Sequence, residues 1–274
     1  QTISTQKLIS LGARFLNHYG IKNAKNEIEW FLQDLLHCDK IKLDDFNINN
    51  KQHNLVIDFL IQRSKKNPFQ YLLGKGSFFG RDFIVDKNVL IPRPETEILI
   101  NIIKDNKYNN LLDIGTGCGC LAITAIIEKI AVNADAIDIS NPALRIAKKN
   151  AELLKINNIK FFNCDIMSDK PNKKYDIIVS NPPYISMEEY EVLYDEVKNF
   201  EPIIALTDFN DGMIFYRRLS KVLKEILNPN GVAVLEISHF FNTHTILDIF
   251  NNFSDIEFFR DLNNDHRAVK IINK

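Results

Sequence analysis

From residue 109 onward, stretches with the pattern of buried β-strands alternate with stretches of helical pattern. The strand-like stretches are 110–115, 134–139, 159–164, 175–180 and 231–238. The helical stretches that separate most of them are 119–129, 141–154, 212–227 and 241–252. Parallel strands need a long crossover connection, which is usually a helix. The alternation therefore predicts an α/β domain whose mostly parallel sheet is covered by helices on both faces.

The last two strand-like stretches, 256–261 and 267–273, are not separated by a helix. Only a short turn lies between them, and it contains Asn263-Asn264-Asp265. These residue types favour tight turns between antiparallel strands. We therefore expect a terminal hairpin that places one antiparallel strand in the sheet.

The first third of the chain has three apolar stripes at helical spacing, and each is predicted to face a core. Their members are Leu8, Leu11, Phe15 and Tyr19, then Ile28, Phe31, Leu32, Leu35 and Leu36, and then Leu55, Phe59 and Leu60. Trp30 is likewise interpreted as a packing residue. This part of the chain is expected to form a small helical domain.

The pattern changes at Gly74, where glycines interrupt aromatic and strand-like residues. Gly74, Gly76 and Gly80 flank Phe78-Phe79 and the strand-like Phe83-Ile84-Val85, which predicts a β-hairpin between two domains. The stretch Ile91 to Glu97 contains two prolines and is expected to lead stiffly into a helix through Ile100. The predicted organisation is a helical domain at 1–73, a hairpin linker at 74–92 and an α/β domain at 93–274.

The composition is that of an ordinary soluble globular protein, with 45% hydrophobic and 25% charged residues. A net charge of −1 gives no global basic field that would draw the chain to nucleic acid or an anionic membrane. No apolar run has the ~18 residues that a membrane span needs. The start, Gln1-Thr2-Ile3-Ser4, lacks a secretory pattern, so a cytoplasmic location is expected.

The four cysteines do not follow a common zinc-binding spacing. They are Cys38, Cys118, Cys120 and Cys164. They are expected to be small, buried or partly buried thiols in a reducing compartment, and no metal site is predicted.

Asn181-Pro182-Pro183-Tyr184 follows a buried-strand pattern and carries the most specific chemical signal. The two prolines have a fixed φ and no N–H, and the residue before each is pushed toward extended geometry. Backbone carbonyls there can point at a ligand, and the asparagine and the aromatic ring add a polar, ring-walled slot. Such a slot suits a planar –NH₂ group, which needs acceptors for its two hydrogens. The same residues also fit a proline-terminated loop after a strand.

The stretch Leu111 to Gly119 reads as a strand that enters a glycine-rich turn and then a helix. Glycines allow the tight turn and let a ligand touch the main chain. The pattern is D-x-G-x-G-x-G, so the carboxylate of Asp113 precedes the glycines. An acid beside the loop disfavours phosphate and favours an ammonium group. S-adenosylmethionine has such a group in its amino-acid tail and carries no phosphate.

Two further acids follow successive strand patterns. Asp138 stands where an acid can accept hydrogen bonds from both ribose hydroxyls. Asp165 could accept the adenine amino group, and Ile166 could lie against the ring. Each acid alone fits a helix cap or a turn. Three acids at the carboxyl edge of one sheet, where open α/β sheets bind ligands, favour a cofactor site.

With these motifs together, the chain resembles the release-factor glutamine methyltransferases, which are class I S-adenosylmethionine-dependent methyltransferases with an NPPY motif. The resemblance covers nearly the whole chain. The stretches that carry it are Gln70 to Gly74, Val89 to Glu97, Asp113 to Gly119, Val179 to Ile185, Glu201-Pro202 and Leu235 to Ile237. The chain departs from the family at Cys118, at Cys120 and after Glu236, where Ser238-His239 follow, which leaves the role of Glu236 open.

The resemblance implies a class I Rossmann-like sheet and an N-terminal substrate-recognition domain. It also implies methylation of the glutamine side-chain nitrogen in the Gly-Gly-Gln motif of peptide chain release factors, with S-adenosyl-L-homocysteine as the product. Asn181, Pro182 and Tyr184 are the predicted catalytic residues, and Pro183 joins them in substrate binding. The predicted cofactor-binding residues are Asp113, Gly115, Thr116, Gly117, Cys118, Gly119, Asp138, Asp165, Ile166 and Asn181. No general base and no metal are expected.

Several alternatives remain open at this point. Arg93, Glu95 and Thr96 resemble a lid or brace over the cofactor, but interdomain packing explains them equally well. Glu201-Pro202 fits either a wall of the slot or a helix entry. An amino-methyltransferase acting on DNA or RNA bases would use the same slot, although such enzymes usually need a basic groove. A non-catalytic scaffold with the same fold is the other rival. The expected partner is a release factor, without membrane or nucleic acid.

Overall fold

The computed structural model describes residues 3–274, and the chain divides into two compact units. The first unit runs to Lys75 and also takes in Tyr194–Phe200, a segment far along the chain. The second unit contains Gly76–Leu193 and Glu201–Lys274. The sequence did not predict that Tyr194–Phe200 joins the first unit. Gln1 and Thr2, with which the predicted helical domain begins, lie outside the described residues.

The first unit consists mainly of helices. Its elements are β1 (Ile3–Ser4), α1 (Thr5–His18), α2 (Ala24–Leu36), the 3₁₀ helix η1 (Lys40–Asp45), β2 (Asn47–Ile48), α3 (Asn50–Ser64), α4 (Phe69–Leu73) and α9 (Asp195–Lys198). Helix α3 begins with a capping box, in which the Asn49 side chain accepts from the Gln52 N–H and the Gln52 side chain accepts from the Asn49 N–H, both at 3.0 Å.

The predicted apolar face of α1 is confirmed at Leu8, which is 5% exposed, and is wrong at its other three residues. Leu11, Phe15 and Tyr19 are 52%, 37% and 46% exposed. The buried residues of this helix are Thr5, Leu8, Gly12, Ala13 and Leu16. Close packing at Gly12 explains the difference, because a Cβ there would lie 2.9 Å from a methyl carbon of Ile28. The buried face of the helix therefore runs through Leu8, Gly12 and Leu16, and Leu11 and Phe15 lie outside it.

Two further packing predictions fail in part. Leu55 is 45% exposed, and the neighbouring Val56 is fully buried in its place beside Phe59. Trp30 is 47% exposed and contacts Phe69, with ring centroids 5.8 Å apart. Both residues lie at the rim of the helical core rather than inside it.

A buried arginine holds Tyr194–Phe200 in the first unit. The Arg63 guanidinium donates to both carboxylate oxygens of Glu27, at 2.6 and 3.1 Å, and to Glu196 of α9 at 2.8 Å. Arg63 is 4% exposed and Glu27 is 7% exposed. Pairing of this kind offsets the cost of burying the two charges.

The second unit is an α/β domain, and the predicted fold class is confirmed. Its first elements are β3 (Lys75–Phe78), β4 (Arg81–Ile84), the 3₁₀ helix η2 (Pro94–Thr96), α5 (Glu97–Ile103), β5 (Tyr108–Ile114), α6 (Cys120–Ile127), β6 (Ala131–Asp138), α7 (Asn141–Leu153), β7 (Ile159–Asn163) and β8 (Tyr175–Ser180). The later ones are α8 (Met187–Glu191), the 3₁₀ helix η3 (Ile203–Ala205), α10 (Ile214–Ile226), β9 (Leu227–Glu236), α11 (Thr243–Ile249), β10 (Asp255–Arg260) and β11 (His266–Asn273). Among the described residues, no helix is long and apolar enough to cross a membrane.

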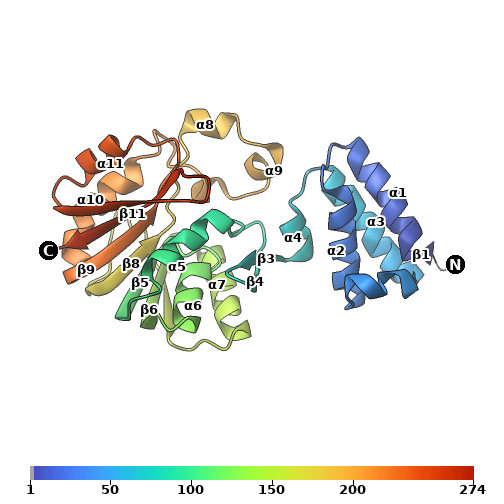
Figure 1. The fold of residues 1–274 in the computed structure, drawn as a ribbon, viewed down its shortest axis with the longest axis horizontal. Helices are drawn as coiled ribbons and strands as arrows, with labels where there is room; N and C mark the ends of the chain where they lie inside the picture. The colour runs from blue at the N-terminus through green and yellow to red at the C-terminus, as the bar shows by residue number, and fades with distance from the viewer. Residues whose placement is uncertain (1–2) are drawn as a thin grey trace. The chain divides into compact units, whose positions relative to one another are not determined.

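The sheet has the strand order β10-β11-β9-β8-β5-β6-β7. Strand β11 is antiparallel to both β9 and β10, whereas the other neighbouring strands that pair are parallel. The predicted terminal hairpin is confirmed, and so is the predicted hairpin of β3 and β4. Helices α5, α6 and α7 lie over one face of the sheet, and α10 and α11 lie over the other (Figure 1).

Successive residues of a strand face opposite layers, and the buried parts of the central strands are mainly apolar on both faces. Leu112 and Ile114 of β5 belong to the core cluster that contains Tyr216 and Leu219 of α10. Leu111, the residue before Leu112, points to the opposite face and is also fully buried. Burial on both faces fixes the register of β5 and β8, and thereby the position of the loops at their carboxyl ends.

Candidate functional site

The carboxyl ends of β5, β6, β7 and β8 open onto a cavity of about 340 Å³ in the second unit. The predicted site residues that line it are Gly115, Thr116, Gly117, Cys118, Asp138, Asp165, Ile166, Asn181, Pro182 and Pro183. Asp113, Gly119 and Tyr184 are not among its lining residues. The loops after these strands therefore bring most of the predicted cofactor residues and the proline slot to one place.

The glycine-rich turn forms the floor of this cavity. Gly115 and Gly117 have φ values of +71° and +54°, which other residues rarely adopt. A Cβ built on either would meet nothing within 4 Å, so both face open space in which a ligand can approach the main chain. Gly119 differs, because its Cβ would press against Ile123 and Ala147 at 3.0 and 3.2 Å. Gly119 therefore lets the start of α6 pack closely against Ala147 of α7.

Asp138 supports the turn and keeps acceptor capacity. Its Oδ2 accepts from the Gly117 N–H at 2.9 Å, and its Oδ1 accepts from the Ser140 N–H at 2.8 Å. Burial raises the pKa of Asp138, and the two backbone hydrogen bonds lower it. Each carboxylate oxygen has a second lone pair, so this side chain can still accept from a diol.

Asp165 forms a turn, which was the alternative to a cofactor role, and it also lines the cavity. Its Oδ1 accepts from the Met167 N–H at 2.9 Å, and its Oδ2 accepts from the Ser168 hydroxyl at 3.1 Å. Ile166 is 5% exposed and provides an apolar wall. The Arg218 Nε donates to the carbonyl of Ile166 at 2.8 Å, which fixes that wall.

Asp113 lies beneath the glycine-rich turn and is fully buried. Its Oδ2 accepts from the Thr116 hydroxyl at 2.7 Å and from the Ala122 N–H at 3.2 Å. Its Oδ1 has no hydrogen-bond partner among residues 3–274. Burial raises the pKa of Asp113 to about 7, whereas these two hydrogen bonds lower it. In this position Asp113 ties the turn to the start of α6.

The proline slot follows directly after β8. The Ser180 hydroxyl donates to the Ile114 carbonyl at 2.7 Å, which joins the end of β8 to the end of β5. The Asn181 Nδ2 donates to the Thr96 hydroxyl oxygen at 3.0 Å. Pro182 is buried and Pro183 is half-buried. Neither proline has an N–H, so these two residues offer carbonyl acceptors without a competing donor.

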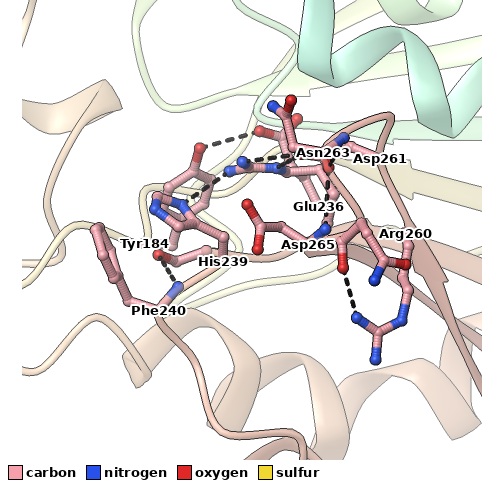
Figure 2. A network of polar contacts seen from close by, with 11 residues as sticks. Tyr184, Glu236, His239, Phe240, Arg260, Asp261, Asn263 and Asp265 are labelled. Carbon is pink, nitrogen blue, oxygen red and sulfur yellow. Dashed lines mark hydrogen bonds and ion pairs between the residues drawn. The ribbon is translucent and has the colours of Figure 1, made fainter.

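Tyr184 points away from the cavity and toward Glu236. Its hydroxyl donates to the Glu236 Oε1 at 3.0 Å, as Figure 2 shows. Its ring packs edge-on against Phe241, with centroids 6.4 Å apart. Phe209 is an aromatic residue that does line the cavity, and it is 55% exposed. Phe209 has a φ of +62°, a property of the loop that the sequence did not reveal.

Glu236 is a buried carboxylate that accepts from Tyr184 near a polar network around Arg267 and Asp261 (Figure 2). It is 1% exposed, and burial raises its pKa to about 7, whereas the hydroxyls of Thr96 and Tyr184 and the charge of Arg267 lower it. Arg267 pairs with Asp261 at 3.2 Å and contacts the His239 Nδ1 at 3.3 Å. The departure from the family pattern after Glu236 thus places His239 beside this arginine.

Arg93 and Glu201 form an ion pair at the rim of the cavity. Glu201 is 5% exposed, and its second oxygen accepts from the Ile91 N–H at 3.2 Å. Both Arg93 and Pro202 line the cavity. The pair therefore braces the proline-rich approach from Ile91 within the second unit.

The cysteines are all free thiols. Cys118, Cys120 and Cys164 line the cavity. The neighbouring Cys118 thiol and burial raise the pKa of Cys120, which disfavours the reactive thiolate. Across residues 3–274, no three His, Cys, Asp or Glu side chains gather as metal ligands.

Comparison with known proteins gives consistent matches. The methyltransferase small domain family matches residues 94–200. A release factor glutamine methyltransferase of Fusobacterium nucleatum is 35% identical and aligns with 96% of this chain and 77% of its own. One from Flavobacterium psychrophilum is 37% identical over 87% of this chain and 85% of its own.

A solved structure of a methyltransferase from Pyrococcus furiosus has the same fold. It superposes with a TM-score of 0.54 at 16% identity and covers 82% of this chain and 99% of its own. This structural match concerns the fold alone, whereas the sequence matches extend over nearly the whole chain at substantial identity. The chain belongs to the release factor glutamine methyltransferase family.

Proposed function

We propose that this chain transfers a methyl group from S-adenosylmethionine to the side-chain amide nitrogen of the glutamine in the Gly-Gly-Gln motif of peptide chain release factors. The observation that carries the proposal is the shared cavity. It brings the glycine-rich turn, Asp138 and Asp165 together with Asn181 and the two prolines that follow. A methyl donor and a planar amide can therefore meet there.

The residues present fit S-adenosylmethionine. The open space above Gly115 and Gly117 accommodates a ligand against the main chain. Asp138 would accept from the ribose hydroxyls, and Asp165 and Ile166 would hold the adenine. Asp113 would act through Thr116 and the turn, because its carboxylate is buried beneath them. When bound, the cofactor supplies a methyl group on a positively charged sulfur and leaves as a neutral thioether.

The slot would present the amide nitrogen in the orientation that reaction requires. An amide nitrogen is a weak nucleophile because its lone pair is delocalised. The Asn181 side-chain carbonyl would accept one amide hydrogen and the Pro182 carbonyl the other, which fixes the amide plane. Positioning of this kind can contribute several kcal/mol, on the order of 7–11 at best. The proposal therefore includes neither a general base nor a metal.

The first unit would recognise the release factor, and the hairpin of β3 and β4 would link it to the catalytic domain. Tyr194–Phe200, the later segment of the chain that belongs to the first unit, lies in the sequence between the slot and Glu201. Exposed apolar residues on α1, among them Leu11 and Phe15, give the first unit an apolar surface for a protein partner. Since the substrate is a translation factor, a cytoplasmic location belongs to this proposal.

A base-modifying amino-methyltransferase is not favoured. The slot chemistry would suit an exocyclic base amine, but the net charge of −1 provides no general attraction to nucleic acid. The relatives that align with most of the chain are named for release factors. A non-catalytic scaffold is disfavoured because the glycine-rich turn, the acids and the slot are all in place.

Transfer of tritiated methyl groups tests the proposal. The purified chain is incubated with labelled cofactor and either a release factor or a nucleic acid, and we expect label only in the release factor. A release factor whose Gly-Gly-Gln glutamine is replaced by alanine serves as the control substrate. Asn181→Ala should lower kcat by about 100-fold and change the cofactor affinity little. Label in nucleic acid alone would refute the proposal.

A further inference from the structure

An asparagine that accepts a hydrogen bond from its substrate must present its carbonyl and keep its –NH₂ elsewhere. The two ends of the amide group have nearly the same shape, so only hydrogen bonding distinguishes them. A flipped Asn181 would offer two donors to the substrate amide, which itself has two hydrogens to donate. Something in the protein must therefore fix the orientation of this side chain.

The structure provides a partner for the –NH₂ end. The Asn181 Nδ2 donates to the Thr96 hydroxyl oxygen at 3.0 Å. Thr96 belongs to η2 and is 3% exposed, so water does not readily replace this contact. The threonine hydroxyl has only one proton, and the direction in which it donates decides what it can accept.

Glu236 determines that direction. It is 1% exposed, its Oε2 has no hydrogen-bond partner among residues 3–274, and the nearby Thr96 hydroxyl lowers its pKa. An ionised carboxylate only accepts hydrogen bonds. The Thr96 proton is therefore attracted toward Glu236, which leaves the Thr96 oxygen as the acceptor for Asn181. Asn181 can satisfy that acceptor only with its –NH₂ group, so its carbonyl faces the other way.

The same carboxylate also holds the far end of the motif. The Tyr184 hydroxyl donates to the Glu236 Oε1 at 3.0 Å (Figure 2). Tyr184, the last residue of the slot, is thus bound to Glu236, and Asn181, the first, is bound to Thr96, whose hydroxyl influences the same carboxylate. This arrangement explains why a carboxylate that does not line the cavity is nevertheless buried behind it.

We infer that Thr96 and Glu236 are positioning residues that fix the amide orientation of Asn181, so that its carbonyl receives the amide of the substrate. The inference rests on the proposed function, because it assigns how one residue of that slot is oriented. Thr96 lines the cavity beside Asn181, whereas Glu236 does not line it. Thr96 acts by accepting from Asn181, and Glu236 acts by determining where the Thr96 proton points.

Two substitutions at Thr96 and one matched control test the inference. Thr96→Val keeps the shape of the side chain and removes the hydroxyl, whereas Thr96→Ser keeps the hydroxyl. Thr124→Val is the control, because Thr124 is also fully buried and its hydroxyl has no partner among residues 3–274. The assay is release factor methylation at about pH 8, where the Glu236 carboxylate is ionised.

We expect Thr96→Val to lower kcat by about 10- to 100-fold with little change in the KM for either substrate. Thr96→Ser should restore most of the rate, and Thr124→Val should match the wild type. A Thr96→Val enzyme with wild-type kcat would overturn the inference and leave the proposed function standing. Absence of methylation by the wild type would instead contradict the proposed function.

The Asn181 side-chain amide gives a readout that is independent of turnover. In a ¹⁵N-labelled sample, its –NH₂ resonances are assigned by their loss in Asn181→Asp. We expect one proton to exchange slowly in the wild type and in Thr96→Ser, and to exchange fast in Thr96→Val. Fast exchange in the wild type would show that Thr96 does not hold the amide. Because the wild type and Thr96→Ser are compared as well, this measurement still tests the inference if Thr96→Val is less stable.

Discussion

Replacement of Gly212 by alanine is expected to displace the slot without touching it. Gly212 has a φ of +79°, and a Cβ there would lie closer than 3.0 Å to the Tyr184 carbonyl oxygen and 3.2 Å from the carbonyl carbon. The left-handed backbone costs an L-residue about 1–2 kcal/mol. To regain an ordinary contact distance, the Tyr184 backbone must also move by roughly 1 Å.

This displacement should appear in catalysis more than in cofactor binding. Tyr184 directly follows Pro183, so a shift of the Tyr184 backbone also shifts the slot. A misplacement of about 1 Å can cost about 100-fold in rate. We therefore expect Gly212→Ala to lower kcat by about that factor, while calorimetric titration finds nearly the same affinity for S-adenosylmethionine.

Gly80→Ala is the matched control. Gly80 has a φ of +73°, but a Cβ there meets nothing within 4 Å. The two variants therefore share the backbone cost and differ in the collision with Tyr184. Steady-state kinetics should show near wild-type kcat for Gly80→Ala. The reasoning fails if Gly212→Ala retains full activity, or if both variants lose activity equally.

Three further predictions concern the cofactor and the buried charges. Asp138→Ala should weaken cofactor binding more than it lowers kcat, and an unchanged dissociation constant in calorimetry would remove Asp138 from the site. Burial raises the pKa of Asp113 from 3.8 to about 7. Between pH 3.8 and pH 7 the folded protein therefore binds more protons than the unfolded chain. The stability that protonated Asp113 contributes is thus lost as pH rises through 7. The free energy of unfolding in urea should therefore fall by roughly 2–3 kcal/mol less in Asp113→Asn than in the wild type between about pH 5 and pH 8. An equal fall in both proteins would contradict the burial of this charge. Arg63→Met should lower the free energy of unfolding by about 3–5 kcal/mol because it leaves Glu27 buried and unpaired, and Arg63→Met combined with Glu27→Leu should recover part of that loss; no recovery would argue against the pair.

The fold was predictable because its signals are local. Strand and helix periods in the second unit, the glycine-rich turn and the terminal hairpin all depend on residues close together in the chain. The predicted stretch 175–180 coincides with β8, Tyr175–Ser180. The loops that line the cavity follow from this topology, since parallel strands end at the same edge of a sheet.

What the sequence did not predict depends on partners far along the chain. The exposed face of α1 follows from how closely Gly12 approaches Ile28. The side chain of Tyr184 turns toward Glu236, which lies 52 residues away. Glu196 joins the first unit through Arg63, 133 residues earlier. Composition and spacing carry no record of such pairings, and only the packed structure reveals them.

Mass spectrometry of a release factor after incubation with this chain and S-adenosylmethionine tests the central claim most directly. Fragmentation of the peptide that contains the Gly-Gly-Gln motif locates any added methyl group. We predict a gain of one methyl group on the side-chain nitrogen of that glutamine, absent when Asn181→Ala replaces the wild type. An unmodified glutamine, or a methyl group on another residue, would contradict the account.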